Sequence, residues 1–149
     1  GGIIKDGAKM VNAVSNSVVP KFTVIIGNSY GAGNYAMCGK AYDPRLIFAW
    51  PSAELAVMGG TQAAKVLAQI ETASMAKKGE KVDAEKEKEV FEAIKARYDK
   101  QTSPYYAAAR LWTDAVIDPL DTRKWISTGI EAANHSPITK PFNLGVIQT

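Results

Sequence analysis

The segment Phe22-Thr-Val-Ile-Ile-Gly-Asn-Ser-Tyr-Gly-Ala-Gly33 decides the fold of this chain. Its first five residues are mostly β-branched, which favours a buried β-strand over residues 22–26. Glycines at 27, 31 and 33, with an Asn-Ser pair between them, predict a turn. We expect a short helix from Asn34 to Lys40 after it. The sequence therefore places a glycine-rich turn between a strand and a helix.

The remainder of the chain continues this alternation of helices and strands. In the charged segment 77–100, Asp83 is the expected N-cap of a helix, and Val90, Ile94 and Tyr98 form its apolar stripe. The alternation favours an α/β layer fold. The other expected helices occupy residues 3–19, 61–75, 107–112 and 124–134, and the other extended segments occupy residues 46–50 and 53–58.

Length and composition restrict the class of protein. The 149 residues suffice for one domain with a core, and 46% hydrophobic and 22% charged residues are ordinary for a globular protein. No apolar run approaches the ~18 residues of a membrane span. The net charge of +3 is too small to indicate nucleic-acid binding. A single cysteine, Cys38, excludes an internal disulfide framework. We expect no metal site, no nucleic acid and no membrane partner.

One interpretation of the turn is a dinucleotide-binding fingerprint. Gly31-Ala-Gly33-Asn-Tyr-Ala36 satisfies the pattern G-x-G-x-x-A. In that fold, however, the first glycine directly follows the strand, whereas Gly27-Asn-Ser-Tyr30 intervenes here. The second strand should also end in an acidic residue, but this one ends in Trp50-Pro51. A phosphate loop agrees less well, because the glycine-to-lysine spacing is one residue too long and Ala41 follows.

A second interpretation is the nucleophile elbow of a serine hydrolase. Gly27-Asn-Ser29-Tyr-Gly31 matches G-x-S-x-G between a strand and a helix. Three aspartates precede the single histidine, His135, so the chain order serine, acid, histidine is available. That histidine lies in a predicted exposed turn at a helix end, where solvated or capping histidines are common. The candidate acids are Asp114, Asp118 and Asp121.

A third interpretation requires no side-chain acid or base. Gly31, Ala32 and Gly33 would let a ligand approach the backbone at the first turn of a helix. The first N–H groups of a helix have no internal partners and carry partial positive charge. Two such groups directed at one oxygen form an oxyanion hole. The alternative is a glycine turn that only permits tight packing between helix and strand.

Motifs spread along residues 1–125 resemble the carboxyltransferase (β) subunits of biotin-dependent acyl-CoA carboxylases, particularly the methylcrotonoyl-CoA carboxylase type. The spacings between the motifs agree as well. The motifs are Gly7-Ala-Lys-Met10, Val19-Pro-Lys21, Gly27-x-Ser-Tyr-Gly-Ala-Gly33-Asn-Tyr-x-Met37-Cys-Gly39, Ala49-Trp-Pro-x-Ala53, Ala56-Val-Met-Gly-Gly60, Ser103-Pro-Tyr-Tyr-Ala107, Ala109-Arg-Leu-Trp112 and Val116-Ile-Asp-Pro119.

The resemblance implies a crotonase-like (ClpP/crotonase) fold, a superhelix of ββα units. It implies that residues 1–149 form the C-terminal part of the C-terminal carboxyltransferase domain, with 136–149 as a surface segment. The implied activity moves CO2 from carboxybiotin to the α carbon of an acyl-CoA. Biotin-dependent decarboxylation of an acyl-CoA on the same fold is an alternative.

The resemblance also implies roles for individual residues. The amides of Ala32 and Gly33 would be catalytic, holding the ureido oxygen of biotin, and Gly31 would complete the cofactor-binding turn. The base belongs to the cofactor, so no catalytic histidine or carboxylate pair is needed. Tyr35 would line the acyl pocket and influence the choice of substrate, unless it only packs in the core.

The resemblance also implies partners. Biotin would arrive on a separate carrier domain or protein, supplied by biotin carboxyl carrier and biotin carboxylase components. Acyl-CoA would bind mainly to another domain, in a homo-oligomer. We expect this chain to be a fragment that lacks that domain, is inactive as a carboxylase alone, and belongs to the cytoplasm or a mitochondrial matrix.

Overall fold

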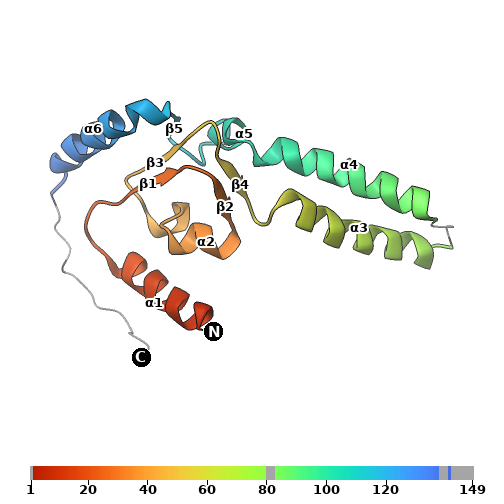
Figure 1. Cartoon of the computed structure of the whole chain (residues 1–149). Helices are drawn as coiled ribbons and strands as arrows, with labels where there is room; N and C mark the ends of the chain where they lie inside the picture. Colours follow the sequence, from red (N-terminus) through yellow and green to blue (C-terminus); the bar gives the residue numbers. More distant parts are fainter. Residues whose placement is uncertain (1, 80–82, 138–140, 142–149) are drawn as a thin grey trace.

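The computed structural model describes residues 2–79, 83–137 and 141, and shows two small parallel sheets surrounded by helices (Figure 1). The larger sheet has the order β1-β3-β5 and consists of Phe22–Ile25, Leu46–Ala49 and Ala115–Val116. The predicted strands at 22–26 and 46–50 are therefore confirmed, each one residue shorter. β-branched and aliphatic side chains of these strands form the core, together with Ala53 and Leu55.

The smaller sheet corrects the predicted turn. Asn28–Tyr30 is a short strand, β2, which pairs in parallel with β4, Glu54–Ala56. Helix α2 spans Gly31–Ala36, so it begins at the glycine and not at Asn34. The helix also ends four residues before the predicted Lys40, because a separate 3-10 turn, η1, occupies Lys40–Tyr42. The glycine-rich segment is thus strand followed by helix start.

Two helices flank the larger sheet region. α1 spans Ile3–Asn16, ending before the predicted residue 19, and lies beside α2. α6 spans Thr122–Asn134 and follows a 3-10 turn, η2, at Pro119–Asp121. A Cβ added at Gly129 would lie 2.7 Å from the ring of Phe22, so α6 approaches β1 closely. Trp50 Nε1 also donates to Thr122 Oγ1 (2.9 Å), which ties the end of β3 to the start of α6.

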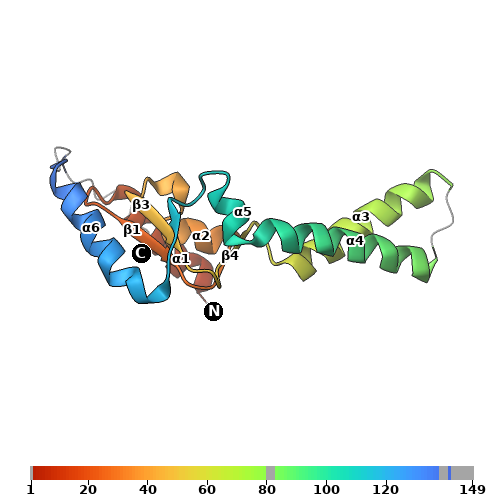
Figure 2. The ribbon, with the colours of Figure 1, turned by 90° about the horizontal axis from the view of Figure 1, so that it is seen from above.

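A hairpin of two long helices projects from this body (Figures 1 and 2). α3 spans Gly60–Lys77, and α4 spans Ala84–Thr102. The predicted stripe is confirmed, because Val90 and Ile94 are buried against Ala64 and Ala68 of α3, with Tyr98 partly buried beside them. The opposite faces of both helices are exposed. The hairpin therefore has its own small core.

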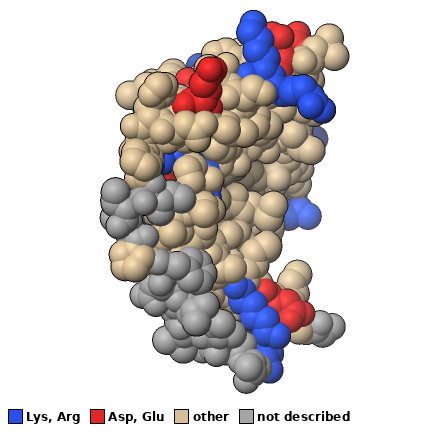
Figure 3. Space-filling view, turned by 90° about the vertical axis from the view of Figure 1, so that its left-hand side faces the viewer, with Lys and Arg blue, Asp and Glu red and all other residues tan. Residues whose placement is uncertain are grey.

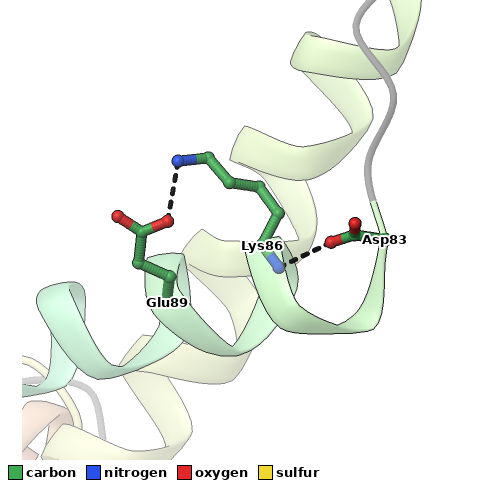
Figure 4. A network of polar contacts seen from close by, with 3 residues as sticks. All are labelled: Asp83, Lys86 and Glu89. Carbon is green, nitrogen blue, oxygen red and sulfur yellow. Dashed lines mark hydrogen bonds and ion pairs between the residues drawn. The ribbon is translucent and has the colours of Figure 1, made fainter.

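The predicted N-cap of α4 is also confirmed. Asp83 Oδ1 accepts a hydrogen bond from the backbone N–H of Lys86 at 2.9 Å. Figure 4 shows this bond beside the exposed ion pair between Lys86 and Glu89. The carboxylate satisfies one of the unpaired N–H groups at the helix start and suits its positive dipole end.

The segment after α4 differs from prediction. α5 spans only Pro104–Ala108, whereas a helix had been expected over 107–112. The chain leaves the helix through Leu111, which has a left-handed φ of 58°. It then forms β5, a strand that the sequence did not predict and that pairs with β3. Asp114 supports this pairing, since its carboxylate accepts the N–H of Ile47 at 2.7 Å.

No helix in the described ranges is long and apolar enough to cross a membrane. Those same residues also contain no group of three His, Cys, Asp or Glu side chains that could hold a metal ion. The predicted surface segment 136–149 lies largely outside the described residues.

Candidate active site at the start of helix α2

Gly31 makes the abrupt change from strand β2 to helix α2 possible. Its φ is +49°, and a Cβ at this position would lie 2.8 Å from the backbone oxygen of Val57. An L side chain is strained in that conformation and would collide with a main-chain atom. Gly31 therefore serves tight packing, the structural role that sequence reasoning had left open for the whole turn.

Gly33 has a different environment. A Cβ added there would meet no atom within 4 Å, and the residue is exposed, as is Ala32. Packing does not require a glycine at this position. The space in front of the backbone is open, which is the condition for a ligand to reach the main chain.

The amides of Ala32 and Gly33 lie in the first turn of α2, where N–H groups have no acceptor within the helix. The N-cap residue, Tyr30, makes no side-chain cap bond. Across the described part of the chain, no backbone carbonyl outside the helix accepts from either amide. Two unpaired donors with partial positive charge therefore belong to exposed residues.

Ser29 and Gly39 hold the other end of α2. Asn34 Nδ2 donates to Ser29 Oγ at 2.8 Å. A Cβ on Gly39 would lie 1.9 Å from Asn34 Oδ1 and 2.8 Å from Asn34 O, so Gly39 leaves room for that side chain. Cys38, buried and with φ of 65°, ends the helix in the left-handed cap conformation. Thr23 Oγ1 donates to the carbonyl of Cys38 at 2.8 Å, fixing the helix to β1.

The structure does not bring the hydrolase residues together. Ser29 bonds to an amide side chain, and two of the three candidate acids accept backbone N–H groups, Asp114 from Ile47 and Asp118 from Leu120. His135 is exposed at the C-terminal end of α6 and does not line the cavity that Ser29 lines. Asp118 caps η2 and Asp114 supports strand pairing, and no hydrogen bond among the described residues links Ser29, His135 and an acid.

A cavity of about 410 Å³ lies next to α2. Gly31, Asn34 and Tyr35 line one side of it, because spacings of three and four place them on one helix face. Strand residues such as Ile25, Ile47 and Leu55 line another part, and residues of α4, α5 and the following loop complete it. Its volume falls within the ~300–1,000 Å³ of small-molecule sites.

Tyr35 lines this cavity and is 50% exposed, so it is not a core residue. Its ring and that of Tyr42 meet edge to face, with centroids 6.1 Å apart. This placement agrees with a residue that borders a ligand pocket. Whether it selects an acyl group remains a prediction.

A polar pair that the sequence did not suggest lies beside the site. Tyr30 donates its hydroxyl hydrogen to Glu54 Oε2, linking β2 to β4 immediately before Gly31. This hydrogen bond, with smaller contributions from burial and from the charges of Glu54 and Asp99, raises the pKa of Tyr30 to about 12. The phenol therefore stays protonated at neutral pH and acts as a donor that steadies the strand pair.

Residues 1–145 match the family model of the carboxyl transferase domain. The chain is 50% identical over 140 residues to the mitochondrial methylcrotonoyl-CoA carboxylase beta chain of Dictyostelium discoideum, covering 94% of this chain and 24% of that protein. This chain is a member of the carboxyl transferase domain family. It spans about a quarter of the length of the curated relatives it matches.

Solved structures agree with this assignment. The beta subunit of P. aeruginosa geranyl-CoA carboxylase superposes with a TM-score of 0.75 at 42% identity, over 97% of this chain and 27% of that one. A transcarboxylase 12S structure, described as a hexamer assembly with methylmalonyl-coenzyme A and methylmalonic acid bound, superposes with a TM-score of 0.80 at 36% identity. The match covers 98% of this chain and 27% of that one. The crotonase-like α/β fold predicted from the motifs is thus confirmed.

Proposed function

We propose that this chain forms the biotin side of an acyl-CoA carboxyltransferase active site, within a larger subunit. The observation that carries the proposal is the pair of unpaired amides at Ala32 and Gly33, exposed next to a position where a side chain would meet nothing. Membership of the carboxyl transferase domain family supports it. A ureido oxygen is an acceptor that such a donor pair suits.

The chain's contribution to the reaction is electrostatic. Carboxybiotin would supply the CO2 and, once CO2 has left, the basic nitrogen that takes the α-proton of the acyl-CoA. The amides of Ala32 and Gly33 would stabilise negative charge on the ureido oxygen, with the dipole of α2 directed the same way. Removal of one donor of this kind costs ~3 kcal/mol in known enzymes. Gly31 fixes the position of both donors, because its left-handed φ sets the first turn.

The substrate and partners follow from the same proposal. The acyl group would lie along Tyr35, and biotin would be delivered by a carrier component from a biotin carboxylase system. Ile3 and Ile4, adjacent on α1 and 85% and 88% exposed, are apolar side chains that another domain or copy would cover. In Figure 3, the described residues between the upper and lower ends of this face are mostly uncharged.

The test uses the chain within a full-length subunit, supplied with a biotinylated carrier and an acyl-CoA. Gly33→Val should lower the rate of carboxyl transfer by about tenfold or more, because the side chain fills the open space before the amides. Gly27→Val is the matched control, since Gly27 also meets no atom within 4 Å and lies outside α2.

The control should keep its activity, and both variants should keep their thermal stability. Equal activity of the two variants would contradict the role of the amides. A full-length wild-type subunit that transfers no carboxyl group to or from any acyl-CoA would contradict the function itself. Activity only in the decarboxylating direction would favour the decarboxylase alternative.

A further inference from the structure

The cavity beside α2 extends to a second wall, built by α4, α5 and the loop after α5. Tyr98 and Thr102 of α4, Tyr106 of α5 and Trp112 line this end. Tyr35 lines the same cavity from α2. A ligand group that passes Tyr35 into the cavity therefore meets a set of aromatic rings from a different part of the chain.

This wall has a defined structure. The N–H of Trp112 donates to the carbonyl of Ala107 at 3.0 Å, and the N–H of Leu111 donates to that of Ala108 at 3.0 Å. With Leu111 in the left-handed conformation, these bonds form the Schellman motif that ends α5. The motif fixes the backbone of Trp112 relative to the helix.

Side-chain contacts then fix its ring. The rings of Tyr106 and Trp112 meet edge to face, with centroids 6.0 Å apart and planes at 68°. The guanidinium of Arg110 lies 3.3 Å from the centroid of the Tyr106 ring. Lys40 Nζ donates to the carbonyl of Leu111 at 3.1 Å, joining the loop to the segment after α2. Such a wall is preorganised and has no need to be ordered by a ligand.

The chemistry of the cavity indicates what it would accept. Among the described lining residues the single charged side chain is Lys40, which already donates to Leu111. Most of the others are aliphatic or aromatic. The bond to Leu111 places Lys40 beside Trp112, and the other described lining side chains at this end are uncharged. An apolar chain would contact rings and methyl groups along its length.

We propose that this cavity receives the apolar acyl chain of the acyl-CoA, and that Trp112 limits the chain length that the site accepts. The proposal rests on the proposed carboxyltransferase function and adds a specificity-determining residue to it. Tyr106 and the Schellman motif position Trp112, so the limit is set by the rigid end of α5.

The experiment measures the dissociation constant and kcat/KM of the full-length subunit for a short branched substrate, methylcrotonoyl-CoA, and a longer one, geranyl-CoA. Trp112→Ala should shift the ratio of both quantities toward the longer substrate by about tenfold or more, because one methylene in an apolar pocket is worth roughly 10–200-fold. Tyr105→Ala is the matched control, since Tyr105 is an adjacent aromatic that is 61% exposed and does not line the cavity. It should leave the ratio unchanged.

Trp112→Phe provides a graded step and a variant with less risk to folding, and should shift the ratio by a smaller factor in the same direction. An unchanged ratio in the folded variants would overturn the proposal. So would a change in carrier-biotin affinity with no change in the acyl-chain ratio, which would assign the cavity to the arm of biotin. If the ratio of dissociation constants shifts in a subunit that shows no turnover, the acyl-chain pocket would be supported and the proposed carboxyltransferase function would be contradicted.

Discussion

Replacement of Gly31 by alanine tests the packing role that the structure gives this glycine. The residue has φ of +49°, and the new Cβ would lie 2.8 Å from the carbonyl oxygen of Val57. The left-handed conformation costs a non-glycine residue about 1–2 kcal/mol. The collision adds about 1–3 kcal/mol, because the obstructing atom is backbone and one strand or helix must shift. Reduced freedom of the unfolded chain returns about 0.4–1 kcal/mol.

The expected net loss is therefore about 1–5 kcal/mol, against the ~5–15 kcal/mol by which domains are stable. Urea unfolding followed by far-UV circular dichroism measures it through the transition midpoint. Gly33→Ala is the matched control in the same helix. It meets no atom within 4 Å and should be neutral or stabilising by up to about 1 kcal/mol, from helix propensity. If the two variants shift the midpoint equally, the distinction between the two glycines is wrong.

Three further substitutions have defined outcomes. Asp83→Ala should cost about 1 kcal/mol in unfolding experiments because it removes the cap of α4, whereas Glu89→Ala, which removes only an exposed ion pair, should cost less than about 0.5 kcal/mol. The raised pKa of Tyr30 predicts that the hydrogen bond to Glu54 stabilises the fold fully below pH ~10 and that this stabilisation is lost as pH rises through about 12. Tyr30→Phe should therefore reduce the decline in melting temperature at alkaline pH. Ser29→Ala should cost about 0.5–1.5 kcal/mol through its bond to Asn34 and should not abolish carboxyl transfer, because Ser29 is not a nucleophile in this proposal. Abolished transfer with unchanged stability would contradict this assignment.

The strands and caps that the sequence predicted correctly have local causes. The β-branched run before Gly27 and the N-cap at Asp83 depend on residues adjacent in the chain. Strand β2 was missed because Asn28-Ser-Tyr30 has the composition of a turn and becomes a strand only by pairing with β4, some 26 residues later. The two-residue strand β5 has the same cause, since its pairing with β3 is its main support.

The end of α5 was missed for a different reason. The run Ala107-Ala-Ala109 favours a helix, and no glycine follows in residues 110–121 that would end it. The chain nevertheless ends the helix at Ala108 and places Leu111 in the left-handed cap position that glycine usually occupies. Packing of Trp112 against Tyr106 accompanies this arrangement. Lys40, which lies 71 residues earlier, donates to the carbonyl of Leu111, and no local pattern records that tertiary contact.

The candidate site was predictable in position but not in physical detail. The sequence shows the same residue type at Gly31, Gly33 and Gly39, but their environments differ. A Cβ at Gly31 or Gly39 would strike backbone or side-chain atoms, whereas a Cβ at Gly33 would face open space. Only the last of these environments favours a ligand over packing. The proposed chemistry of this turn would be carried by main-chain N–H groups, whose freedom depends on backbone conformation and neighbouring carbonyls. It follows that stability and ligand access can be altered separately, at residues two positions apart in one short helix.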